Sequence, residues 1–311
     1  MTRKTTVILS LFLLMILSVV YLTLYFIPRA ALFQDRTAIL ATPASVGLHF
    51  EDVELQPRDE PITLAAWWIP AASPVAKMVF VHGGGSNRTS EFFQALDFYR
   101  AINARGVSVL TLDLRNHGES DGDGQGLKFG ANEYPDVLAA IEWLDEKSPN
   151  TPLLAMGKSM GGATVIHAAA RGARLDGLVL LDPALDTQSA LINGIWAGSG
   201  IPRFLLTPAV HAATSRYDLP EGDSDALELA TGLELPILII QDPDDPVTVA
   251  GFARELASRN RHVSLWEAPP TDTKNAKIAG KGRWGSHVAA FHVHPDATLA
   301  TIMSFIKSLE I

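Results

Sequence analysis

A pentapeptide of sequence Gly-Lys-Ser-Met-Gly, residues 157–161, most constrains what this chain can fold into. A short apolar run, Leu153–Met156, precedes it and is typical of a buried strand, and Met160–Arg171 follows as a helix built mainly from small residues. A strand that turns directly into a helix holds Ser159 in a strained backbone conformation, and glycines two residues to either side avoid side-chain clashes at the turn. The pattern alone is weak, but this context predicts a nucleophilic serine.

The rest of the chain favours an α/β fold. From Val46 onward, strand-like and helix-like stretches alternate, which is typical of a largely parallel sheet with helices on both faces. We expect eight strands, at Leu48–Leu55, Ile62–Ile69, Met78–His82, Val107–Asp113, Leu153–Met156, Gly177–Leu181, Ile237–Gln241 and Val263–Glu267. We expect helices at Ser90–Arg105, Tyr134–Lys147, Met160–Arg171, Val249–Arg259 and Ala297–Leu309. A chain of 311 residues suits one such domain, residues 46–311, with appendages.

Two segments interrupt this alternation. Asp186–Glu234 joins two strands with about fifty residues rich in Gly, Pro and large apolar side chains, which is longer than a crossover needs. We expect this insertion, residues 186–234, to form a cap over the sheet. Ala268–Trp284 is a polar loop with glycines and lysines after the last expected strand.

The first 29 residues are a candidate membrane anchor. Thr5–Ile27 contains no charged residue, and about twenty apolar residues in a helix span the core of a bilayer. A cleaved signal peptide is the alternative, but its apolar region spans only about 7–15 residues and ends in small residues, where this chain has Pro28-Arg29. Aromatic residues suited to a membrane interface lie at the outer end of the run: Tyr21, Tyr25 and Phe26.

The charges beside the anchor indicate its direction. Arg3 and Lys4 favour a cytoplasmic N-terminus, although Arg29 and Arg36 follow the span and dilute the bias. We therefore expect a single-pass membrane protein that contacts the bilayer through residues 5–27 and carries its main domain outside the cytoplasm.

Composition argues against several other classes of protein. A net charge of −9, with no Lys/Arg tract after residue 36, argues against a nucleic-acid partner. The absence of cysteine excludes disulfides, cysteine metal sites and a thiol nucleophile. The histidines lack metal-ligand spacing on one helix and the glycine-rich segments lack nucleotide-binding spacing, so we expect no metal and no organic cofactor.

A nucleophilic serine needs a base that takes its proton and a third group that orients the base. We expect the acid just after the strand Ile237–Gln241, where Asp242, Asp244 and Asp245 crowd together. Asp245 opens the turn into the next helix and is the first choice, with Asp244 second. A solvated turn or a helix N-cap accounts for the aspartates that are not used.

We expect the base between the last strand and the last helix, where His287, His292 and His294 qualify. His287 is the first choice because its small neighbours, Gly285-Ser286, let the ring approach the serine. His292 and His294 suit surface or helix-capping positions.

The turn Val81–Gly85 is a candidate oxyanion hole. Attack on a carbonyl places negative charge on its oxygen, which fixed backbone N–H groups stabilise without reorganising. The three glycines after His82 let the backbone approach a ligand closely. The expected donors are the N–H groups of Gly84 and Met160.

Four segments, taken in their order and spacing, carry a family resemblance: His82–Gly85, Asp113–Ser120, Gly157–Gly162 and Asp244–Val247. The chain resembles α/β-hydrolase superfamily serine hydrolases, in the branch of membrane-anchored ABHD/BEM46-type and serine-aminopeptidase-like enzymes. The resemblance covers residues 46–311 and implies the chain order serine, acid, histidine. It also implies that the Asp-x-Arg-x-x-Gly-x-Ser block, residues 113–120, supports the site. His117 in this block is therefore expected to be structural and not catalytic, and the same is expected of His82.

The chain departs from this family in three places. Asp242-Pro243 stands where relatives carry glycine, the loop Ala268–Trp284 lengthens the path to His287, and Lys158 is an unusual neighbour for the serine. The first two departures loosen the choice of acid and histidine. For Lys158 we weigh contact with an anionic substrate group against a plain surface position, and expect the surface position.

The sequence therefore predicts a membrane-anchored serine hydrolase that cleaves an acyl or lipid-like ester through an acyl-enzyme, with Ser159, Asp245 and His287 as catalytic residues. The alternatives are an amide or peptide hydrolase, and a non-catalytic membrane-anchored binding protein that keeps the fold.

Overall fold

The apolar runs of the sequence form one eight-stranded sheet in the computed structural model, which describes residues 3–272 and 274–309. The strands are β1 (Glu51–Leu55), β2 (Leu64–Ile69), β3 (Ala76–Val81), β4 (Val107–Leu112), β5 (Leu153–Lys158), β6 (Gly177–Leu181), β7 (Ile237–Gln241) and β8 (Val263–Glu267). Their order across the sheet is β1-β2-β4-β3-β5-β6-β7-β8. The β1–β2 and β2–β4 pairs are antiparallel, and the other neighbours are parallel. The predicted fold class is confirmed, and each expected strand is present with its ends shifted by at most three residues.

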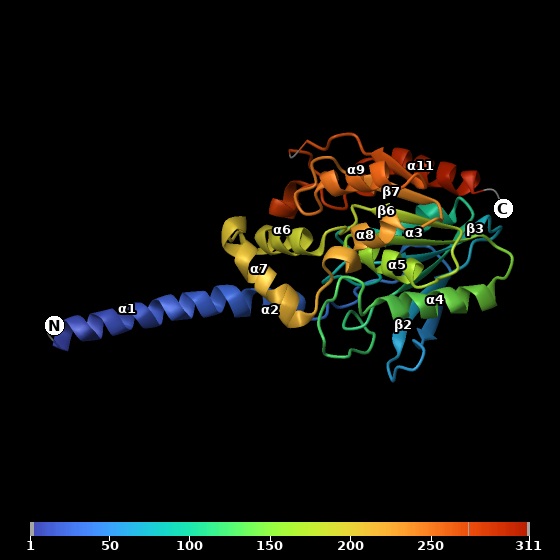
Figure 1. Cartoon of the computed structure of the whole chain (residues 1–311). Coiled ribbons are helices and arrows are strands. Elements are labelled where there is room, and N and C mark those ends of the chain that lie inside the picture. Colours follow the sequence, from blue (N-terminus) through green and yellow to red (C-terminus); the bar gives the residue numbers. More distant parts are fainter. Residues whose placement is uncertain (1–2, 273, 310–311) are drawn as a thin grey trace.

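Helices cover both faces of the sheet, which explains why its central strands are mostly apolar (Figure 1). Every residue of β3 is buried; Val79 and Val81 belong to one core, while Met78 and Phe80 belong to the other. The first core contains the buried sides of α4 (Tyr134–Lys147), α5 (Met160–Ala170) and α9 (Ala250–Arg259). The second contains those of α3 (Ala95–Asn103), α10 (Ala290–Val293) and α11 (Pro295–Ser308).

The helix expected at Ser90–Arg105 begins five residues late, at Ala95. The preceding segment forms turns in which Ser90 and Gln94 have positive φ angles of 37° and 61°, a conformation that a helix does not contain. The last helix begins two residues early, because Pro295 occupies its first position, where proline needs no N–H partner.

The segment expected to form a cap lies between β6 and β7 and is mostly helical. It contains α6 (Thr187–Ser199), α7 (Arg203–Tyr217), a short 3₁₀ turn η3 (Gly222–Ser224) and α8 (Ala226–Thr231). Asp186 caps the N-terminus of α6 by accepting a hydrogen bond from the N–H of Ser189 at 2.7 Å. Gly200, with φ 78°, ends α6 and lets the chain reverse into α7.

The N-terminal segment is one long helical stretch, α1 (Arg3–Tyr21), the π-helical turn η1 (Leu22–Phe26) and α2 (Ile27–Leu32). In length and apolar composition it suits a membrane span, although a signal sequence has the same properties. No described residue of α1 is buried, and the helix projects away from the sheet (Figure 1). Pro28 and Leu32 of α2 are buried, so the C-terminal end of this helical stretch lies inside the fold.

The end of the N-terminal helix is joined to α7 by a side-chain contact. Arg216 of α7 donates a hydrogen bond to the carbonyl of Leu24 at 3.0 Å, and its guanidinium lies 5.1 Å from the ring centre of Tyr25. One arginine thus connects α7 to the π-helical turn of the N-terminal helix.

Phe98 is fully buried on α3, with its ring 5.8 Å from Phe80 and 5.2 Å from Phe291. Phe98→Ala is expected to lower the free energy of unfolding by about 3–5 kcal/mol, because it removes apolar side-chain surface that folding buries away from water and leaves a cavity in its place. Phe204→Ala, at a residue of α7 that is 74% exposed, is the matched control and should change stability by less than about 0.5 kcal/mol. Urea unfolding of the detergent-solubilised chain measures both values, and equal losses would contradict the packing described here.

Candidate active site

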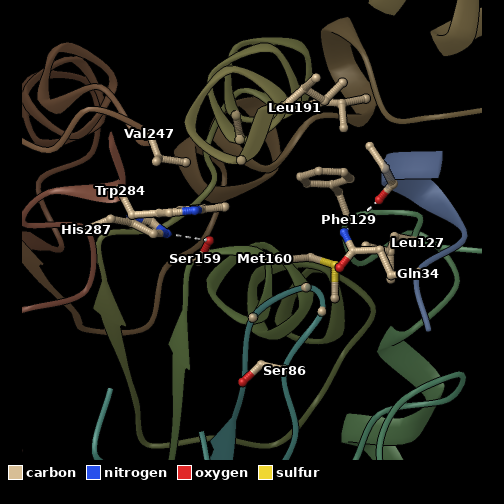
Figure 2. A pocket seen from close by; sticks show the side chains of 18 of the residues that line it. Gln34, Ser86, Leu127, Phe129, Ser159, Met160, Leu191, Val247, Trp284 and His287 are labelled. Atoms are coloured by element: carbon tan, nitrogen blue, oxygen red, sulfur yellow. Dashed lines mark hydrogen bonds between the residues drawn. The ribbon is translucent and has the colours of Figure 1, made fainter. Parts of the chain in front are cut away.

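Ser159 lies at the turn between β5 and α5 in a strained conformation, with φ 52° and ψ −124°. Its backbone is fixed on both sides. The N–H donates to the carbonyl of Leu181 at 3.0 Å, and the carbonyl accepts from the N–H groups of Gly162 and Ala184 at 2.9 and 3.0 Å. These bonds hold the serine at the carboxyl end of the sheet with its hydroxyl facing a cavity (Figure 2).

The glycines around Ser159 are required by close backbone contacts. A Cβ added at Gly157 would lie 2.2 Å from the carbonyl oxygen of Gly161. One added at Gly161 would lie 2.3 Å from the carbonyl oxygens of Val81 and His82. Since Cβ atoms do not approach backbone oxygen so closely, the turn accepts no side chain at either position.

The structure brings His287 to Ser159. Its Nε2 lies 3.1 Å from Ser159 Oγ (Figure 2). Its Nδ1 lies 2.7 Å from Asp245 Oδ2. Because a carboxylate only accepts, Nδ1 carries the proton and Nε2 is free to accept the proton of the hydroxyl. The ring is buried and lies beside Trp284, with ring centres 6.0 Å apart.

Among the three aspartates after β7, Asp245 is the one that contacts His287. Its Oδ1 accepts from the N–H groups of Val247 and Thr248 at 2.7 and 3.0 Å, and its Oδ2 accepts from the hydroxyl of Thr248 at 2.7 Å. These bonds fix the carboxylate against the imidazole. Asp244, the second choice, is exposed.

Asp242 is buried, and its Oδ1 accepts from the N–H of Asp244 at 2.8 Å, which makes it part of the turn. His292 and His294 lie elsewhere. His292 contacts Gln94 at 2.5 Å, and His294, at the start of α11, contacts the carbonyl of Pro269 at 3.1 Å.

Asp182, at the end of β6, is a buried acid that sequence reasoning misses. Its Oδ1 accepts from the N–H of Asp242 at 2.7 Å, and its Oδ2 accepts from the N–H of Val288 at 2.8 Å. It thereby joins the loop that carries the acid to the loop that carries His287. Burial, followed by the charge of Asp245, raises the pKa of Asp182 well above its usual range. Its place directly after a buried strand was the available signal.

One ligand atom each from Asp182, Asp245 and His287 lies within 4.8 Å of the others, which is a spacing that a metal ion accepts. The carboxylate oxygens involved, however, already accept hydrogen bonds from backbone N–H groups, a hydroxyl or the imidazole. This arrangement suits a hydrogen-bonded catalytic cluster better than a metal site.

Two buried histidines shape the candidate oxyanion loop. His82 Nε2 accepts from the N–H of Leu114 at 3.1 Å, and His117 Nε2 accepts from the N–H of Gly85 at 3.3 Å. Burial lowers the pKa of His82 well below its usual value and that of His117 to about 4. Both rings are therefore neutral and serve to fix the glycine turn, as the family resemblance implies.

Within residues 3–272 and 274–309, no carbonyl accepts the N–H of Gly84 or of Met160. Met160 is buried, where a backbone donor is rarely left without an acceptor, whereas Gly84 is exposed and its N–H is open to solvent or to a ligand. Both residues line the cavity beside Ser159, so the two free donors lie where an oxyanion would form.

The Asp-x-Arg-x-x-Gly-x-Ser block, residues 113–120, packs next to the segment that follows the glycine turn Val81–Gly85. The carboxylate of Asp113 accepts from the N–H groups of Arg88 and Glu119 at 2.6 and 2.9 Å and pairs with the Arg88 guanidinium. A Cβ at Gly118, where φ is 45°, would lie 2.1 Å from that carboxylate. The glycine of the motif is therefore required by the acid that precedes it.

The prediction of a surface position for Lys158 is wrong. Its side chain is buried, with 4% of the residue exposed, because the residue before the serine still belongs to β5, which is covered on both faces. Burial is the main cause that lowers the pKa of this amine to about 7.

A cavity of about 620 Å³ opens above Ser159. Figure 2 shows Ser159 and Met160 facing Leu191 of α6 across it, with Trp284 and His287 at one end and Leu127 and Phe129 at the other. The end of the N-terminal helix supplies part of the wall through Phe26, Ile27, Ala30 and Ala31. The loop expected at Ala268–Trp284 contributes Trp284, which ends the short helix η4 (Ala279–Trp284).

Comparison with known proteins gives consistent matches. The family model described as "Serine aminopeptidase, S33" matches residues 72–213. The uncharacterized Escherichia coli protein YfhR is 26% identical over 247 residues, which are 75% of this chain and 76% of that protein. A putative monoglyceride lipase of Schizosaccharomyces pombe is 28% identical over 229 residues, covering 61% of this chain and 58% of the lipase.

Among solved structures, the esterase Pf2001 of Pyrococcus furiosus superposes with a TM-score of 0.68 at 22% identity. The superposition covers 88% of this chain and 97% of the esterase. At this identity the likeness shows the fold, and it extends over nearly the whole domain.

Proposed function

We propose that this chain, a member of the α/β-hydrolase superfamily with esterase- and lipase-like relatives, is a membrane-anchored serine hydrolase of acyl esters. One observation carries the proposal. Ser159, His287 and Asp245 form a continuous hydrogen-bonded series at the floor of an apolar cavity.

The proposed reaction uses each of these groups in turn. Ser159 Oγ attacks the ester carbonyl while His287 Nε2 takes its proton, and Asp245 stabilises the imidazolium. The N–H groups of Gly84 and Met160 hold the oxyanion, a contribution that is about 10²–10³-fold in rate for a single donor. His287 then protonates the leaving alcohol, and a water activated by the same ring releases the acyl group from Ser159.

An amide or peptide hydrolase is the second candidate, and the description of the matching family model favours it. An aminopeptidase holds the free amine of its substrate, which requires an acidic group near the nucleophile. The cavity lining, as far as the structure describes the chain, contains no aspartate or glutamate. This lining favours an ester over a peptide substrate.

The cavity wall supports a substrate with an apolar acyl chain. Most of the lining side chains are aliphatic or aromatic, and they come from α6, from the loop before α4 and from the end of the N-terminal helix. The S. pombe relative is named a putative monoglyceride lipase, which accords with a lipid-like ester.

The same wall favours a retained anchor over a cleaved signal. Phe26, Ile27 and Ala30 line the cavity, and Leu32 is 1% exposed. Cleavage near residue 29 would remove part of the wall and uncover the core beside it. We propose that residues 5–27 cross the membrane with Arg3 and Lys4 in the cytoplasm, so that the hydrolase domain lies outside it.

Covalent labelling tests the proposed nucleophile. A fluorophosphonate probe is expected to label the full-length chain, because it reacts with a serine whose hydroxyl is activated by a neighbouring base. Ser159→Ala should lose the label completely, while Ser86→Ala, at another serine that lines the cavity, should keep it. Labelling of Ser159→Ala at the wild-type level would overturn the proposal.

The choice of acid is tested by two neighbouring substitutions. Asp245→Asn is expected to lower kcat for a p-nitrophenyl ester by about 10³–10⁴, because an amide no longer holds the imidazole in the required tautomer. Asp244→Asn, at an exposed position one residue earlier, should leave kcat within about twofold. A large loss of kcat in Asp244→Asn and a small one in Asp245→Asn would identify Asp244 as the acid that orients His287.

The role of the helix wall is tested with esters of graded acyl length. Ala30→Trp narrows the cavity and should lower kcat/KM for a long-chain p-nitrophenyl ester by about tenfold. This loss corresponds to about two methylene groups that can no longer be buried. The value of kcat/KM for p-nitrophenyl acetate should not change. Val19→Trp, on the exposed part of the same helix, is the control and should change neither. The full-length chain is needed, since Phe26 and Ile27 contribute to the wall. Equal losses for both esters would contradict an acyl chain at this position.

A further inference from the structure

Lys158 places a buried amine beside the proposed nucleophile. It is the last residue of β5, only 4% exposed, and it lines the cavity together with Ser159 and Gly83. Among the described residues that line the cavity, it is the single lysine, and arginine is absent there.

The absence of a side chain at Gly83 leaves room for this amine. A Cβ added at Gly83 would lie 3.1 Å from Ser159 Cβ and 3.5 Å from Lys158 Nζ. The amine therefore lies next to the serine, on the same side of the glycine turn. Any charge that it carries acts at the position where the ester would bind.

The amine has no partner in the part of the chain that the structure describes. Neither a hydrogen bond nor an ion pair involves its Nζ, and the groups close enough to affect it electrostatically do not offer a negative charge. Lys281 of η4 lowers the pKa of Lys158, and Lys158 in turn lowers the pKa of His82, after β3, and of His117, after β4. The carboxylates of Asp182 and Asp245 act electrostatically on Lys281, and both are occupied by other donors.

A buried ammonium without a counter-charge is unfavourable, and the group responds by losing its proton. The pKa of Lys158, lowered to about 7 chiefly by burial, reflects that cost. A negative group delivered by a ligand would remove the cost, restore the proton and gain a charge-assisted hydrogen bond. Within the described lining, the cavity thus offers one lysine among side chains that are mostly apolar.

We propose that Lys158 binds an anionic group, a carboxylate or a phosphate, carried by the alcohol part of the ester close to the scissile carbonyl. The inference rests on the proposed function, since it assumes that Ser159 is the nucleophile. The apolar walls take the acyl chain, and Lys158 takes the charge at the other end. The substrate class is an anionic amphiphile, a single-chain acyl ester with an acidic head group.

Two matched pairs of esters test this proposal in mixed micelles of a non-ionic detergent. The first pair is dodecanoyl glycolate and ethyl dodecanoate, which differ by a carboxylate. The second is 2-(dodecanoyloxy)ethyl phosphate and 2-hydroxyethyl dodecanoate, which differ by a phosphate. Because each pair shares one acyl chain, the ratio of kcat/KM within a pair isolates the head group, and the two pairs distinguish the two anions.

The wild-type chain is expected to prefer at least one anionic ester over its neutral partner by about tenfold or more. Lys158→Met, which keeps the length of the side chain and removes the amine, should abolish this preference while neutral esters are still hydrolysed. Lys307→Met, at an exposed residue of α11, removes the same charge elsewhere and should keep the preference.

The preference should also depend on pH in a defined direction. Lys158 is protonated below its pKa of about 7, so the ratio should be highest there and fall as pH rises through and above 7. The carboxylate of the glycolate ester stays ionised over this range, and an effect of pH on the hydrolysis step itself cancels in the ratio because both members of a pair share it. In Lys158→Met the ratio should be flat.

Failure of this inference is distinct from failure of the proposed function. If the wild type takes the fluorophosphonate label and hydrolyses neutral esters without preferring either anionic ester, the anionic site is refuted and the hydrolase stands. An equal loss on neutral and anionic esters in Lys158→Met also refutes it, because the amine would then act on the oxyanion. Loss of labelling in Ser159→Ala, measured separately, tests the hydrolase itself.

Discussion

The strained turn at Ser159 is the constraint on which the rest of the site depends. It exists because the backbone of Gly161 passes within van der Waals distance of β3 at Val81 and His82, leaving no space for a Cβ. The same approach brings the turn after β3 next to the N-terminus of α5, which places two free N–H groups beside one hydroxyl. The proposed nucleophile and the proposed oxyanion donors are therefore positioned by a single packing contact between neighbouring parallel strands.

The other half of the site is assembled by Asp182. This residue joins the loops that follow β7 and β8, which carry Asp245 and His287 from distant parts of the sequence. A carboxylate that accepts only backbone donors suits this purpose, because its bonds do not depend on side-chain rotamers. The consequence is that His287 follows the long loop Ala268–Trp284 and is still held in place, because Asp182 accepts a hydrogen bond from the N–H of the next residue, Val288.

The strands and the serine turn could be predicted because both leave local traces: continuous apolar runs where a sheet is covered on both faces, and glycines where backbones touch. The order of acid and histidine follows from the fold. Three features leave no local pattern in the sequence. The burial of Lys158 depends on the strand continuing up to the serine, and the late start of α3 depends on turns at Ser90 and Gln94. The part of the cavity wall formed by Ile27 depends on a contact with α7, which is far along the chain.

Burial moves the titratable groups around Ser159 towards neutrality. It raises the pKa of Asp182 and lowers those of His82, His117 and Lys158. A site that is buried away from water has a low effective dielectric, so each charge introduced by a substrate has a large effect. Of these groups, Lys158 alone lines the cavity and lies near neutral pH, where a small change in its surroundings decides whether it carries a proton. Under the proposed function, one such amine in a largely apolar pocket would discriminate between head groups by charge, while the walls would discriminate between acyl chains by length.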